Sequence, residues 1–136
     1  MSLEMGKSIL ATVVLVLALA QAISMAQIRG YLRFKLIPLP AKSLRNWHRW
    51  GGEATLLLTL LVALICLTGE TYSSYAWRVP LHAALGTLAA LTMSAKVIMA
   101  RRFRRYLRYG PLLGATAGLA VLGTFIASAL WYLWSL

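Results

Sequence analysis

Four long apolar stretches limit what this chain can fold into. They cover about residues 8–28, 45–69, 79–100 and 111–134, and each is long enough to cross a bilayer as a helix. Only helices and closed barrels satisfy their own backbone hydrogen bonds in lipid. The sequence therefore predicts an all-α integral membrane four-helix bundle, with residues 1–136 forming a single transmembrane domain.

The first stretch has some features of a cleavable signal peptide. Lys7 precedes an apolar run that contains the small-residue segment Ala18-Leu19-Ala20. The run continues to Ile28, however, which is long enough to cross a membrane. We therefore expect a retained helix.

The net charge of +11 is concentrated in two connecting segments. Only Lys7 precedes the first stretch and only Arg78 lies in the middle connection, whereas the first and third connections are strongly basic. Because such loops stay in the cytoplasm, we expect extracytoplasmic N- and C-termini. Basic loops also bind anionic lipid headgroups, so the lipid membrane is the expected partner and nucleic acid is not.

The first connection, residues 29–46, mixes basic residues with aromatic and aliphatic ones. This pattern is typical of a segment that lies on the cytoplasmic membrane surface. A solvated connector is the equally weighted alternative.

The two histidines lie on the same helix faces as small and hydroxyl residues. Helical spacing predicts one face in the second stretch and one in the third, comprising His48, Gly52, Thr55, Thr59, Val62, Cys66 and Gly69, and His82, Gly86, Ala89, Met93, Lys96 and Ala100. Small residues allow membrane helices to approach closely. We therefore expect His48, His82 and Lys96 to face the bundle interior, where ionisable residues usually have a function.

Imidazole is a common axial ligand of haem iron, so His82 and His48 are the candidate metal ligands. Antiparallel helices place them about a membrane thickness apart, at 1.5 Å of rise per residue, so both cannot bind one iron. Candidate second ligands are Met25, Lys96 and Met99 beside His48, and Cys66 and Glu70 beside His82. Lys96 is also a candidate cofactor-binding residue through haem propionates. Core packing or interface contacts are the competing structural roles for all of them.

From His48 onwards the chain resembles an uncharacterised bacterial family of four-helix membrane proteins, itself similar to haem-b cytochromes and ferric-reductase-like membrane proteins. The resemblance covers about residues 48–134 and is carried by HRWGG at 48–52, VALICL at 62–67, HAALG at 82–86, SAKV at 94–97 and SALWY at 128–132. It implies a haem between the outer halves of the second and third spans, held by one histidine from each. His82 matches one of these, but the other position is Ile65, which cannot bind iron.

Two functional hypotheses follow. The favoured one is a small membrane subunit of a respiratory or photosynthetic redox complex, on a cytochrome-like scaffold that has lost its haem. The alternative is a haem-b electron-transfer protein with His82 as axial ligand; a chlorophyll-type pigment would also accept a single histidine. A small transporter is a distant third, since no stretch is broken at its middle.

The sequence does not predict an independent enzyme. Its acidic residues are Glu4, Glu53 and Glu70, which form no carboxylate pair. The small residues at 114–118 predict close packing within the chain, and a homodimer or a contact with another membrane subunit is the alternative.

Overall fold

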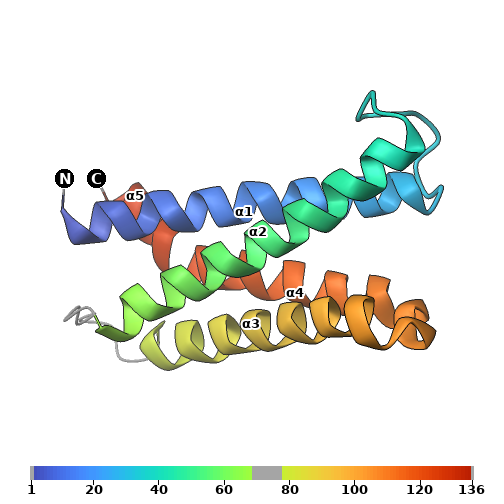
Figure 1. Ribbon diagram of the computed structural model, residues 1–136. Coiled ribbons are helices and arrows are strands. Elements are labelled where there is room, and N and C mark those ends of the chain that lie inside the picture. The colour runs from blue at the N-terminus through green and yellow to red at the C-terminus, as the bar shows by residue number, and fades with distance from the viewer. Residues whose placement is uncertain (1, 69–77, 136) are drawn as a thin grey trace.

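A computed structural model describes residues 2–68 and 78–135 of the chain (Figure 1). The first three long helices are α1 (Leu3–Ile28), α2 (Ala41–Thr68) and α3 (Arg78–Arg102). The fourth long segment joins four shorter pieces end to end, η1 (Arg104–Tyr109), α4 (Gly110–Phe125), the π-helical turn η2 (Ile126–Leu130) and α5 (Trp131–Trp134). Within the described residues, four helical segments are long and apolar enough to cross a membrane. The predicted all-α membrane architecture is confirmed to that extent.

The helices extend past the apolar stretches that predicted them. α1 begins at Leu3, because the Ser2 hydroxyl caps it by accepting a hydrogen bond from the Met5 amide at 3.2 Å. α2 begins at Ala41, directly after Pro40, rather than near residue 45. Hydropathy marks only the part of a helix suited to hydrocarbon, whereas caps and prolines set where the helix begins. The predicted end of the second span at residue 69 and the candidate ligand Glu70 lie outside the described residues.

The bundle consists of two helix pairs. α1 packs along α2, α3 packs along α4, and the α1–α4 contact joins the pairs, whereas the α2–α3 contact is smaller than any of these (Figure 1). Both termini lie at one end, here called the terminal end, where the Ser2 and Tyr132 hydroxyl oxygens are 3.4 Å apart. The opposite end, called the basic end, carries the α1–α2 connection and η1, and there Arg29 Nη2 donates a hydrogen bond to the Leu107 carbonyl at 3.3 Å.

Small side chains make the central contacts. The buried cluster contains three alanines, two valines and one methionine, namely Val14, Ala89, Met93, Ala117, Ala120 and Val121. Large aliphatic side chains point outward instead; Leu57 and Leu91 are 67% and 65% exposed. This is the arrangement expected where lipid solvates leucine and small residues bring helices together.

The inward faces predicted for α2 and α3 are confirmed at their centres. Thr55, Ala89 and Met93 are buried, and the Thr59 hydroxyl lies 3.6 Å from the Met93 sulfur. Ala100, at the end of the predicted α3 face, is exposed.

Two glycines of α4 differ in what a methyl group would meet. A Cβ at Gly123 would lie 2.9 Å from Leu85 Cδ1, whereas a Cβ at Gly118 would meet nothing within 4 Å. Gly123→Ala should therefore be less stable than Gly118→Ala by about 1 kcal/mol, because the end of the Leu85 side chain must shift and overpacking costs about 1–3 kcal/mol, whereas both variants gain the same amount, about 0.5–1 kcal/mol, from removing a helical glycine. Gly118→Ala, the matched control, should leave stability unchanged or raise it. Thermal unfolding in detergent measures both, and equal effects would contradict the tight α3–α4 contact.

Candidate functional site

The Ser24 and His48 side chains join α1 to α2 in the basic half of the bundle. The Ser24 hydroxyl is completely buried and lies 2.7 Å from His48 Nδ1. It also donates a hydrogen bond to the Gln21 carbonyl at 2.9 Å. A serine hydroxyl has one proton to donate, so His48 Nδ1 must be the donor to Ser24. This hydrogen-bond pattern therefore assigns a proton to Nδ1.

The Gln21 side chain lies against Gly51 and Gly52 of α2. A Cβ at Gly51 would collide with the Gln21 amide, and one at Gly52 would lie 3.7 Å from its Oε1. The two glycines therefore make room for this amide between α1 and α2. Gln21 Oε1 is nevertheless buried without a hydrogen-bond partner among the described residues, so the polar contact between α1 and α2 is incompletely satisfied here.

Lys96 reaches this region from α3. Its Nζ would lie 3.1 Å from a Cβ at Gly114, so the glycine of α4 accommodates the lysine side chain. Lys96 interacts electrostatically with both His48 and Arg29. The nearby acid Glu53 is already paired with Arg101, at 2.6 Å. The structure therefore brings two predicted site residues, His48 and Lys96, into one half of the bundle, in a basic environment.

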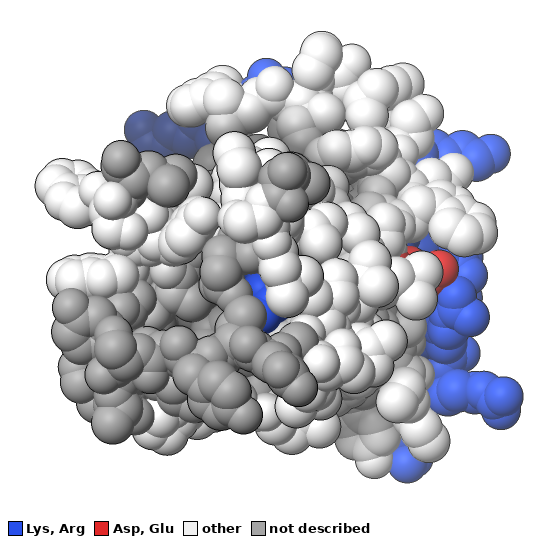
Figure 2. All heavy atoms as spheres, turned by 90° about the vertical axis from the view of Figure 1, so that its left-hand side faces the viewer, with Lys and Arg blue, Asp and Glu red and all other residues white. Residues whose placement is uncertain are grey.

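His82 lies in the other half. Its described neighbours come from α1 and α4, namely Lys7, with which it interacts electrostatically, and the Thr124 backbone. One turn later, Gly86 faces the Thr124 methyl group. His82 Nδ1 is buried without a hydrogen-bond partner among the described residues. Figure 2 shows the terminal end, where a small basic patch is visible between uncharged side chains and residues that are not described.

The two histidines cannot serve one iron atom. His48 contacts the basic half of α1, whereas His82 lies near Lys7 in its terminal half. The position paired with His82 by the resemblance is occupied by the aliphatic Ile65, and the described residues contain no group of three or more His, Cys, Asp or Glu that could hold a metal. A haem with two histidine ligands from one chain therefore does not fit. Met25, Met99 and Cys66, the other candidate ligands, are half-buried.

One protein-family model matches the chain over its whole given length. The model of a family of unknown function, DUF6529, covers residues 1–136. The chain belongs to this family. No curated protein and no solved structure matches it. The relation to haem-b cytochromes and ferric-reductase-like proteins stays a prediction.

Sequence reasoning missed the α1 part of the polar cluster. Gln21 and Ser24 are polar residues three positions apart within an otherwise apolar stretch, and that spacing puts them on one helix face. Polar side chains inside a membrane helix usually face other helices rather than lipid. This signal would have predicted an inward polar face on α1, although not its pairing with His48.

Removing the Ser24 hydroxyl should weaken the α1–α2 contact. Ser24→Ala removes the side-chain acceptor of His48 Nδ1 and leaves the Gln21 backbone as its described hydrogen-bonding neighbour, so it should cost about 1 kcal/mol, the net contribution of a typical hydrogen bond. The matched control is Thr12→Val, because among the described residues the Thr12 hydroxyl donates within its own helix, to the Ser8 carbonyl at 2.8 Å. Thermal unfolding in detergent gives the stabilities, and imidazole ¹⁵N shifts report the His48 tautomer. If both variants unfold alike and the shifts of His48 stay unchanged, the Ser24–His48 hydrogen bond is not formed.

Proposed function

We propose that this chain is a small integral membrane subunit of a redox complex, respiratory or photosynthetic, on a haem-b cytochrome-like scaffold that no longer completes a haem site. The proposal places the basic end in the cytoplasm, because the Lys- and Arg-rich connections lie there. Both termini are then extracytoplasmic, and the membrane is the inner membrane of a bacterium. No catalytic residue is assigned to the chain itself.

The observation that carries this proposal is the incomplete ligand pair. The scaffold's motif residues are present at His82 and at the HRWGG segment, but Ile65 stands where the second axial ligand would be. The neighbours of His82 come from α1 and α4. A chain that keeps the scaffold without the ligand pair is better suited to stabilising an assembly than to carrying electrons alone.

The environment of His48 supports a structural role for this residue. Metal-bound imidazoles usually donate their second ring N–H to a fixed acceptor, and Ser24 supplies such an acceptor. The same bond also ties α1 to α2 where Gly51 allows close approach. Lys96 interacts electrostatically with His48. In this proposal it adds a positive charge beside the imidazole and is not a second iron ligand. His48 therefore serves helix association in this proposal.

One observation favours the alternative, a haem-b electron-transfer protein with His82 as axial ligand. The buried Nδ1 of His82 has no described partner, so the orientation of this imidazole is not explained by hydrogen bonding through that atom. A bound haem would supply one-electron redox chemistry, and a chlorophyll-type pigment is the other group that a single histidine would suit. In either case His82 would hold the group, and the second axial ligand of a haem would come from outside the described residues or from a partner.

A visible spectrum separates the two functions. Protein expressed with ample haem and purified in mild detergent should show no stoichiometric b-type band in the reduced-minus-oxidised spectrum, and pyridine haemochrome analysis should give far less than one haem per chain. His82→Ala should then change neither spectrum. A stoichiometric band that is lost in His82→Ala and retained in the matched control His48→Ala would establish the electron-transfer alternative instead.

The subunit role is tested in native membranes. Gentle solubilisation of the tagged chain should recover it in a complex much larger than the 15.0 kDa chain, with redox subunits identified by cross-linking and mass spectrometry. Recovery only as a monomer or a homodimer would contradict a place in a redox complex.

A further inference from the structure

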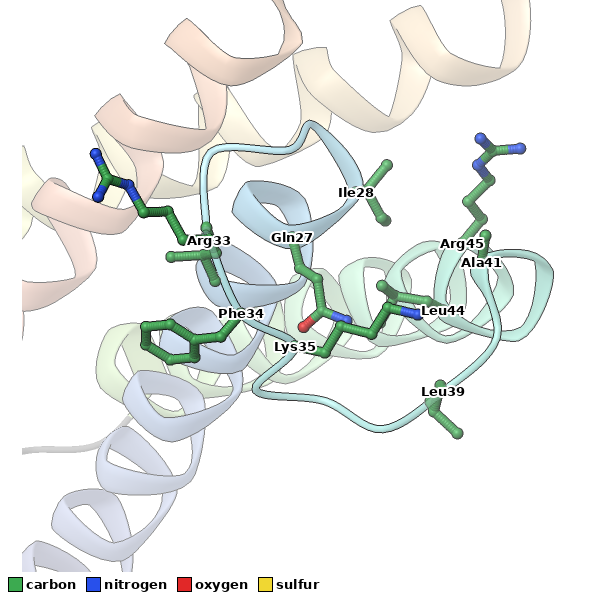
Figure 3. Close-up of a pocket in the computed structure, with 10 residues that line it drawn as sticks. Gln27, Ile28, Arg33, Phe34, Lys35, Leu39, Ala41, Leu44 and Arg45 are labelled. Carbon is green, nitrogen blue, oxygen red and sulfur yellow. The ribbon is translucent and has the colours of Figure 1, made fainter.

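The basic end contains a pocket that the proposed function does not use. It has a volume of about 280 Å³ and lies between the end of α1, the α1–α2 connection and the start of α2 (Figure 3). Both charged and aliphatic side chains line it. Its position, beside the ends of two apolar helices, corresponds to the headgroup level of a membrane.

The connection is held in place by a side-chain amide. Gln27 Nε2 donates to the Ile37 carbonyl at 2.8 Å, and the Ile37 amide donates to Gln27 Oε1 at 3.0 Å. At the start of the connection, Gly30 adopts φ +76°, a left-handed conformation that favours glycine after a helix end. The pocket is therefore formed by a folded connection, most of whose residues are exposed.

The charges of the pocket are all positive. Arg33, Lys35 and Arg45 line it, and none of its lining residues is acidic. The Lys35 side chain extends across the pocket toward Leu44, while Arg33 and Arg45 extend outward from different sides (Figure 3). Glu53, an acid of the neighbouring part of α2, is engaged with Arg101 of α3. An anionic ligand would supply the missing countercharge.

The rest of the lining is apolar. Leu44 is 3% exposed and closes the pocket on the α2 side, and Leu39 and Phe34 contribute from the connection. Phe34 is 64% exposed, so it is available to contact hydrocarbon beside the pocket. A ligand that contacts both the basic and the apolar lining residues would combine a phosphate group with hydrocarbon chains.

We propose that this pocket binds an anionic phospholipid. The phosphate lies at Lys35 within the pocket, Arg33 and Arg45 add positive charge on different sides of its rim, and the glycerol and upper acyl chain contact Leu39, Leu44 and Phe34. Soluble phosphate compounds share the charge but leave the apolar lining unused. A zwitterionic lipid has the same hydrocarbon chains, but its headgroup carries a cation of its own. That cation would be repelled by the three basic residues of the pocket.

Native mass spectrometry of the full chain in detergent tests the proposal, with phosphatidylglycerol and phosphatidylcholine added at equal concentrations. We expect phosphatidylglycerol to bind preferentially. Each basic residue near an anionic headgroup strengthens binding by about fivefold, so Arg33→Gln/Lys35→Gln/Arg45→Gln should weaken phosphatidylglycerol binding by about tenfold or more. The matched control Arg102→Gln/Arg104→Gln/Arg105→Gln removes the same charge from the other basic segment and should retain most of the binding.

A second variant separates the folded pocket from its charge. Gln27→Leu keeps every charge but removes both hydrogen bonds to Ile37, and it should weaken phosphatidylglycerol binding severalfold. It also decides the case if the triple variant does not fold, as judged by circular dichroism and gel filtration. Glycerol phosphate at the concentration of the lipid should not displace phosphatidylglycerol.

Four outcomes would overturn the proposal. They are equal binding of the two lipids, equal loss in the pocket and control triple variants, unchanged binding in Gln27→Leu, and displacement of the lipid by glycerol phosphate. The second would mean diffuse charge attraction, and the last would mean a site for free phosphate. None of these measurements depends on haem or on a redox partner, so the fate of the proposed function does not affect them.

Discussion

The absence of water from the bilayer core constrains everything else in this structure. A polar group inside the bundle needs a partner from the chain itself. Most hydroxyls meet this need locally, by donating to the carbonyl four residues earlier, as Thr55, Thr59, Thr124 and Ser128 do. These residues therefore sit in apolar helices at little cost, and they mark no site.

The remaining polar groups divide the molecule into two halves with different character. In the basic half, Ser24 and His48 satisfy each other between α1 and α2, with Lys96 and the Gln21 amide close by. In the terminal half, His82 has Lys7 and the Thr124 backbone as neighbours, and its Nδ1 has no described partner. The basic half thus has the features of a helix junction. The terminal half contains the histidine whose Nδ1 has no described partner.

The apolar stretches were sufficient to predict four helices, and the spacing of small residues predicted the inward centres of α2 and α3. Helical rise predicted that His48 and His82 lie far apart. These features follow from local composition and from period, which a sequence displays directly. The early start of α2 at Ala41 was missed because it depends on Pro40, to which hydropathy is insensitive.

Other features depend on which helices become neighbours, and no local pattern encodes that. The Ser24–His48 bond joins residues 24 positions apart, and the Gln27 amide pairs with a backbone segment 10 positions away. The neighbours of His82 follow from α4 packing against both α3 and α1. The π-helical turn at Ile126–Leu130 likewise has no recognisable composition.

The unequal contacts between helices bear on how the protein is made. α1 with α2 and α3 with α4 form two hairpins of consecutive helices, each with an extensive contact of its own, and the α1–α4 contact joins them. Helices that enter a membrane in order of synthesis can pair as soon as their neighbour has been inserted. We expect each hairpin to form during translation, and the second to dock on the first once α4 is in the bilayer. The bundle is then assembled from two preformed hairpins that associate within one chain. The two hairpins separate most easily along the α2–α3 contact, which is smaller than the α1–α4 contact.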